Sequence, residues 1–150
     1  MCILSKNGGD EMTKKEKAVK ICELLKQDYP EAICQLNAET PFQLLVATRL
    51  SAQCTDARVN LVTPALFKKY PTENELSEAN IEDVEKLIHS CGFYRAKAKD
   101  LVGMAEMVKT KYNGVLPDTI EELTLLPGVG RKTANLIVGD VYKKPAVVAD

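Results

Sequence analysis

Apolar residues recur every three or four positions along most of this chain, the spacing that gathers them on one face of an α-helix. This spacing predicts helices over residues 14–28, 42–50, 56–70, 73–77, 81–90 and 93–112, and two more on either side of a turn at 127–130. No segment sustains the alternation of apolar and polar residues that is typical of a half-buried strand. The sequence therefore predicts an all-α fold with short loops and no internal repeat.

Residues that favour helix starts support the first two boundaries. Thr13 and Glu16 have the spacing of a capping box, and Thr40 is followed by Pro41, which suits the first position of a helix. The helix over 42–50 is apolar on almost all sides, apart from a glutamine and an arginine. A helix of this composition is buried in a core, so we expect it at the centre of the fold.

The helix over 81–90 is bounded by two residues with known preferences. Asn80 precedes it and is a favourable cap for the helix start. Gly92 follows it and is predicted to close it as a C-cap, because glycine tolerates the left-handed conformation found there. In the same way we expect Gly114 to end the long helix over 93–112.

The most informative stretch reads LPGVGRKTAN over residues 126–135. Helical spacing before and after it predicts two helices joined by a tight turn, a helix-hairpin-helix. Gly128 and Gly130 are predicted to take positive φ and to let the backbone approach a ligand without a Cβ in the way. The second helix begins just beyond Gly130 with unpaired N–H groups, and such a turn suits a phosphate.

Three other kinds of glycine-containing turn can be compared with this stretch. A phosphate-binding P-loop requires a glycine directly before its lysine and a preceding strand, whereas Arg131 precedes Lys132 and a helix precedes the turn. The dinucleotide fingerprint fails because its third glycine would fall at Thr133. A purely structural hairpin with a glycine C-cap remains open on this pattern alone.

Composition excludes some classes and leaves others open. With 150 residues, of which 45% are hydrophobic and none is tryptophan, the chain suits one domain with an aliphatic core. A formal net charge of −1 gives no global signal for nucleic acid, so DNA binding would depend on a local surface. Five widely spaced cysteines and one histidine favour a reduced intracellular chain without a metal site. We expect residues 1–12 to be a flexible lead-in and not a signal peptide, and no segment is apolar enough to predict a membrane span.

The hairpin resembles that of the endonuclease III family of DNA base-excision repair glycosylases. Similar motifs occur in the same order elsewhere: PFQLL at 41–45, SAQCTD at 51–56, GFY at 92–94 followed by Lys97-Ala98, and AVVAD at 146–150. The resemblance implies a six-helix barrel over 31–150 with its helix-hairpin-helix at 119–142. The helix over 13–30 would belong to a second domain whose remaining helices follow position 150 in the family.

The resemblance implies catalytic roles for Lys132 and Asp150, which lie eighteen positions apart. Lys132 would displace the damaged base, form a Schiff base with the sugar, and cut the strand by β-elimination. A nucleophilic amine must be neutral, and the start of a helix, the neighbouring Arg131 and partial burial would all favour that form. Asp150 would stabilise positive charge on the sugar or relay a proton.

Other residues are expected to contact DNA. By resemblance, Gln53 is inserted into the duplex opposite the flipped nucleotide and Phe93 is an apolar wedge. Without the resemblance, both would be interpreted as ordinary loop and core residues. The backbone of Gly128, Val129 and Gly130 is expected to contact a phosphate, with Arg131 beside it and Arg95, Lys97 and Lys99 adding attraction. Thr55 or Asp56 is predicted to cap the following helix and to organise the nearby loop.

The resemblance also bears on cofactors and partners. The family's [4Fe-4S] cluster is held by four cysteines that would lie beyond Asp150, so no cofactor is expected in this chain. We expect double-stranded DNA with an oxidised pyrimidine or an abasic site as partner, a location in the cytoplasm with the chromosome, and self-association through the apolar face of the helix over 14–28. The alternatives are a DNA-binding helix-hairpin-helix module without activity and an adenine-specific mismatch glycosylase, a class that lacks the lysine at position 132.

Overall fold

The computed structural model describes residues 12–148 and divides the chain into two compact units, Met1–Cys34 and Gln35–Asp150. Helix α1 (Lys14–Asp28) forms the described part of the first unit. The predicted capping box is present, since the N–H of Glu16 donates to Thr13 Oγ1 over 3.3 Å and the N–H of Thr13 donates to Glu16 Oε2 over 2.7 Å. No side chain of α1 is buried, so its apolar face is exposed and self-association through it stays a prediction. The predicted lead-in at 1–12 falls, apart from Met12, outside the described residues.

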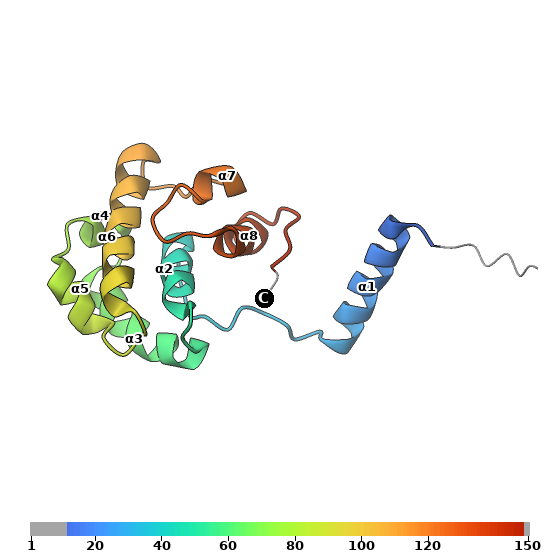
Figure 1. Cartoon of the computed structure of the whole chain (residues 1–150), viewed down its shortest axis with the longest axis horizontal. Coiled ribbons are helices and arrows are strands. Elements are labelled where there is room, and N and C mark those ends of the chain that lie inside the picture. Colours follow the sequence, from blue (N-terminus) through green and yellow to red (C-terminus); the bar gives the residue numbers. More distant parts are fainter. Residues whose placement is uncertain (1–11, 149–150) are drawn as a thin grey trace, which may run out of the picture. The chain divides into compact units, whose positions relative to one another are not determined.

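Seven helical segments make up the described part of the second unit (Figure 1). They are α2 (Pro41–Ser51), α3 (Asp56–Lys69), α4 (Glu73–Ser77), α5 (Ile81–Leu87), α6 (Tyr94–Lys111), α7 (Ile120–Leu123) and α8 (Arg131–Asp140). Turns and irregular segments connect them, and residues 12–148 contain no strand. The predicted all-α fold is confirmed.

Helix α2 occupies the centre of this unit, as its composition predicted. It contacts α3, α6 and α8, and in Figure 1 it lies between α6 and α8. Leu45, Val46 and Leu50 have no exposed surface, because neighbouring helices cover α2 on several sides. Thr40 accepts a hydrogen bond from the N–H of Gln43 over 3.2 Å and so fixes the start of the helix.

The predicted end of helix α5 was wrong. Helix α5 ends at Leu87, three residues early, and Gly92 is neither its C-cap nor in a positive-φ conformation. The chain leaves the helix in a turn in which the N–H of Cys91 donates to Ile88 O over 2.8 Å. Both of these side chains are fully buried, so packing them into the core outweighs continuing the helix. The left-handed conformation falls on Phe93 instead, with φ of 58°.

Helix α6 is 18 residues long and buries one face against the core, including the fully buried Leu101, Met104 and Val108. As predicted, Gly114 ends it, with φ of +80° and its N–H donating to Val108 O over 2.9 Å. Neither α6 nor any other helix within residues 12–148 combines the length and the apolar character needed to cross a membrane.

Candidate nucleic-acid interface

The helix-hairpin-helix is formed by α7, the turn that follows it, and α8. Helix α7 is only four residues long, and Leu126 lies in the turn after it and is almost fully buried. Helix α8 begins at Arg131 after Gly130, which has no side chain to cap the helix start. The first N–H groups of α8 are therefore not satisfied by a capping side chain.

Gly128 occupies a position that only glycine fits. Its φ is +72°, and a Cβ there would lie 2.4 Å from Arg49 Nε and 2.7 Å from Asp100 Oδ2. Gly130, by contrast, is extended with φ of −90° and ψ of 176°. The predicted positive φ is therefore confirmed for Gly128 and wrong for Gly130. A Cβ on Gly130 would meet nothing within 4 Å, so this side of the turn is open to an approaching ligand.

An ion pair that was not predicted lies directly beneath the turn. Arg49 of α2 donates to Asp100 Oδ2 of α6 from Nε over 3.0 Å and from Nη2 over 2.6 Å. Both side chains are largely covered, which strengthens a hydrogen-bonded ion pair. An arginine within an otherwise apolar central helix was the available signal, because a buried charge requires a partner. The pair joins α2 to α6 and supports the hairpin turn at Gly128.

Val129 anchors the tip of the hairpin to the core. Its side chain is only 7% exposed, and its N–H donates to Leu126 O over 3.1 Å. Pro127 packs on α6, where a Cβ added to Gly103 would lie 3.2 Å from its Cγ. The side chains of the turn thus face the protein, and the backbone of Gly128 and Gly130 is exposed.

Arg131 and Lys132 form the first turn of α8, and both are exposed. Ala134 and Ile137, on the opposite face of α8, have no exposed surface. The partial burial predicted for Lys132 is therefore wrong, because the amphipathic pattern of α8 turns this residue toward solvent. Asp150, the predicted second catalytic residue, lies outside the described residues.

Gln53 and Phe93 lie on two turns that the fold brings together, which we call the paired turns (residues 51–54 and 91–93). Both residues adopt the left-handed conformation, with φ of 53° and 58°. The turns are adjacent, since a Cβ added to Gly92 would lie 3.7 Å from Gln53 O. Both side chains are exposed, Phe93 to 71%, so Phe93 is not the core aromatic that the alternative interpretation required. Their insertion into a duplex stays a prediction.

Of the two residues predicted to cap the helix after the first of the paired turns, Thr55 does so. Its Oγ1 accepts a hydrogen bond from the N–H of Arg58 over 3.2 Å. Asp56 is the first residue of α3, where a carboxylate is favourable near the positive end of the helix dipole.

Lys97 differs most from its predicted role. It was expected to attract DNA together with Arg95 and Lys99, which are exposed, but its side chain is only 1% exposed. Its Nζ donates hydrogen bonds of 2.8 Å to Leu50 O and to Ala52 O. Burial lowers the pKa of Lys97, and the neighbouring Cys91 and Cys54 oppose that change. Lys97 therefore belongs to the interior beneath the paired turns. Of these three residues, Arg95 and Lys99 remain available for electrostatic attraction of DNA.

The described cysteines do not fit an iron–sulfur cluster. Cys22 and Cys34 are exposed, whereas Cys54 and Cys91 belong to the two paired turns and interact with each other. Burial, with Cys54 beside it, raises the pKa of the Cys91 thiol to about 11, so this sulfur is held as a thiol. Within residues 12–148, no three potential ligands converge on one point.

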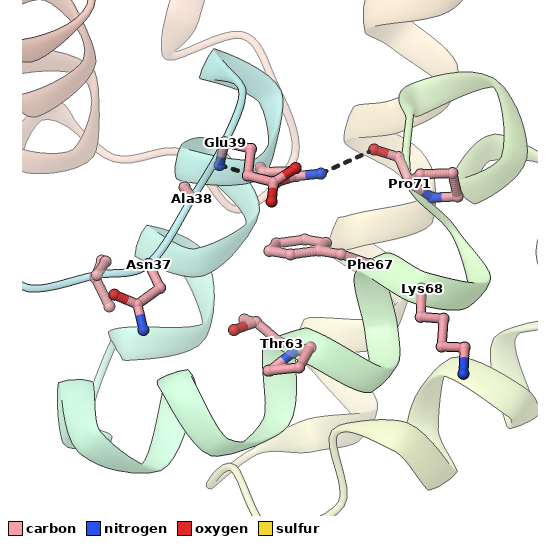
Figure 2. Close-up of a pocket in the computed structure, with 10 residues that line it drawn as sticks. Asn37, Ala38, Glu39, Thr63, Phe67, Lys68 and Pro71 are labelled. Carbon is pink, nitrogen blue, oxygen red and sulfur yellow. Dashed lines mark hydrogen bonds between the residues drawn. The ribbon is translucent and has the colours of Figure 1, made fainter.

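A pocket of about 700 Å³ opens elsewhere, between the segment before α2 and helix α3 (Figure 2). Within it, the Gln43 side chain accepts a hydrogen bond from the N–H of Glu39 over 3.0 Å and donates to Pro71 O over 3.2 Å. Phe67 forms one wall, and the buried Thr63 lies below it. None of the predicted site residues lines this pocket, so it is separate from the candidate interface.

A family model described as HhH-GPD superfamily base excision DNA repair protein matches residues 46–147. Endonuclease III of Synechocystis sp. is 50% identical over 130 residues, which cover 87% of this chain and 59% of that protein. Endonuclease III of Bacillus subtilis is 44% identical over 122 residues, or 81% of this chain and 56% of that protein. The chain thus spans less than two thirds of the length of these relatives.

Solved structures show the same likeness. The structure of a trapped endonuclease III–DNA covalent intermediate, an estranged-adenine complex, matches 93% of this chain with a TM-score of 0.84 and 42% identity, and the match covers 65% of that protein chain. This match confirms the predicted helix-hairpin-helix fold and the resemblance carried by the sequence motifs.

Proposed function

Because the chain belongs to the HhH-GPD superfamily of base excision DNA repair proteins, we propose that it removes oxidised pyrimidines from duplex DNA and cleaves the resulting abasic sites. Its likeness to endonuclease III supports the combination of these two steps in one protein. In this proposal the substrate is double-stranded DNA in the cytoplasm, and Lys132 and Asp150 perform the chemistry.

The observation that carries the proposal is the position of Lys132. It lies one residue beyond the start of α8, is exposed, and follows a turn whose backbone is open at Gly130. A phosphate bound at the turn would bring the adjacent nucleotide to the same place. The trapped covalent intermediate of endonuclease III, a protein 42% identical to this chain, supports covalent chemistry.

The proposed reaction passes through a covalent intermediate between Lys132 and the sugar. The neutral amine of Lys132 attacks C1′, and the bond from C1′ to the base breaks, so that the base leaves with the electron pair and receives a proton. The nitrogen lone pair then forms an iminium between Nζ and C1′, and the C1′–O4′ bond breaks, so that O4′ leaves with the electron pair and takes up a proton from solvent. Removal of a C2′ proton then expels the 3′ phosphate by β-elimination, and water hydrolyses the iminium to free the lysine. Asp150 would stabilise the positive charge that develops on the sugar.

The DNA contacts divide between the hairpin and the paired turns. The backbone N–H groups around Gly128, Val129 and Gly130 would bind a phosphate, with Arg131 adding charge. Gln53 would occupy the space left by the extruded nucleotide, and Phe93 would press between neighbouring bases. The exposure of both side chains and the adjacency of their turns support this assignment.

Borohydride trapping tests the proposal directly. The chain is incubated with a duplex that carries a single abasic site, and borohydride reduces any iminium to a stable amine that shifts the protein in a denaturing gel. We expect an adduct with the unaltered chain and a loss of at least about 10³-fold in its rate of formation in Lys132→Ala, because the nucleophile is absent.

Lys143→Ala is the matched control, since it removes an exposed amine from the loop after α8, away from the first turn of the helix. It should form the adduct at a rate close to that of the unaltered chain. Binding to the duplex without an adduct would favour the inactive DNA-binding module, and release of adenine from a mismatch without an adduct would favour the mismatch glycosylase. An adduct that persists in Lys132→Ala would overturn the role of that residue.

A further inference from the structure

We propose that Lys97 is a positioning residue that holds the paired turns together, and so sets the direction in which Gln53 and Phe93 leave the protein surface. The assignment rests on the proposed function only where it concerns DNA. From its place in the sequence, Lys97 was expected to be a cation that faces DNA, but its side chain is buried.

The side chain of Lys97 reaches the first of the paired turns from below. Its Nζ lies 2.8 Å from Leu50 O, in the last turn of α2, and 2.8 Å from Ala52 O, the residue directly before Gln53. These carbonyls belong to the end of a helix, where backbone oxygens lack helical partners and attract a cation. One amino group therefore fixes the backbone on which the left-handed Gln53 depends.

The backbone of Lys97 binds the second of the paired turns. Its N–H donates to Phe93 O over 3.0 Å, as the first helical hydrogen bond of α6. Phe93 is the N-cap residue of α6, where its side chain makes no capping hydrogen bond, and its left-handed conformation is strained for an aromatic residue. Lys97 thus connects the segment directly before Gln53 with Phe93 through three hydrogen bonds, two from its side chain and one from its backbone.

The burial of Lys97 shows why another residue would not serve equally well. An apolar replacement would leave both carbonyls without this donor, and the loss is greatest at Leu50 O, because Leu50 is fully buried and a buried carbonyl without a partner is costly. Arginine has a planar, longer head group, and because Lys97 is almost fully enclosed the surrounding groups would have to move to admit it. We therefore expect the lysine geometry itself to matter, not only the charge.

Hydrogen exchange tests the positioning role without DNA. Lys97→Met has a similar length and cannot donate, so amide exchange in a peptide covering residues 51–55 should rise at least about tenfold more than the loss of global stability explains. Val108→Ala is the matched control, because it removes buried volume from the same helix far from the paired turns. It should raise exchange throughout the unit with no excess at 51–55.

Two outcomes of this measurement would overturn the assignment. One is an unchanged exchange rate at 51–55 in Lys97→Met, and the other is a rise no larger than that in Val108→Ala. If Lys97→Met does not fold, Lys97→Arg is measured in its place, and a selective rise at 51–55 is expected again. Full protection at 51–55 in a folded Lys97→Arg would show that any cation suffices and would overturn the geometric requirement.

Binding to DNA tests the functional half. Affinity is measured for a duplex with a tetrahydrofuran abasic-site analogue and for the intact duplex, in Gln53→Gly, Lys97→Met and the double variant. The ratio of the affinity for the abasic duplex to that for the intact duplex should fall about tenfold in each single variant. It should fall little further in the double variant, because both changes disable the same contact. Additive losses would overturn the positioning role. Equal affinity of the unaltered chain for the two duplexes would instead overturn the proposed function, and hydrogen exchange would still decide the assignment of Lys97.

Discussion

The hairpin turn and the paired turns both place residues in the left-handed conformation at the candidate interface, but they do so with different residue types. In the hairpin the position is Gly128, and its lack of a side chain lets the backbone rest on the ion pair of Arg49 and Asp100. In the paired turns the positions are Gln53 and Phe93, for which this conformation costs about 1 kcal/mol or more each. The hairpin therefore presents backbone, whereas the paired turns present side chains.

The two lysines of these regions show the same contrast. Lys132 lies in the first turn of α8, at the N-terminal end of the helix, and is exposed. Lys97 is buried, and its amino group faces carbonyl oxygens at the opposite end of a helix, α2. The position of an amine relative to a helix terminus thus distinguishes a candidate nucleophile from a structural donor.

Gly128→Ala should break the hairpin and have the largest effect on stability. The added Cβ would meet Arg49 Nε at 2.4 Å and would also be strained at φ of +72°. We expect the free energy of unfolding to fall by about 2–3 kcal/mol, measured by urea denaturation.

Gly130→Ala is the matched control, because its Cβ would meet nothing within 4 Å. It should change stability by less than about 1 kcal/mol and yet weaken DNA binding, since the methyl group stands where a phosphate would approach. Equal losses of stability in the two variants would contradict the assignment of different roles to the two glycines.

The stability of the protein should depend on alkaline pH because of Cys91, which lies in the second of the paired turns. Its pKa is raised from 9.0 to about 11 in the folded protein, so between these pH values the folded state binds more protons than the unfolded state. The free energy of unfolding should therefore fall as pH rises from 9 to 11, by about 2 kcal/mol.

The comparison with Cys91→Ala isolates this contribution, because Cys54, Lys97 and Arg58, which act on the Cys91 thiol, are present in both proteins. Denaturation at several pH values should give a shallower slope in the variant. Parallel slopes would show that burial does not perturb this thiol.

Phe93→Gly tests the strain in the second of the paired turns and should have the smallest effect on stability. Glycine relieves the left-handed strain but increases the freedom of the unfolded chain, so we expect a gain of up to about 1 kcal/mol in stability. The same variant should bind an abasic duplex less tightly, as it lacks the wedge. Phe93→Ala keeps the strain and should show no gain in stability; an equal gain in both variants would rule out strain as the cause.

Local signals in the sequence predicted several elements with their caps. The capping box at Thr13, the starts at Thr40 and Thr55, and the end of α6 near Gly114 all follow from short-range chemistry and are present in the structure. The end of α5 was mispredicted because it depends on burial of Ile88 and Cys91, which are packed by residues distant in sequence. Local preference could not reveal that competition.

The all-α class, the central helix and the position of the hairpin could be predicted from the sequence, because helical periodicity and glycine spacing are properties of neighbouring residues. Which cations reach the surface depends on the packing of helices that are distant along the chain. Lys97 and Lys132 have similar sequence surroundings, but one amine is enclosed beside the end of α2 and the other is exposed at the start of α8. The ion pair of Arg49 and Asp100 likewise joins residues 51 positions apart, so only packing of α2 against α6 could bring them together beneath the hairpin.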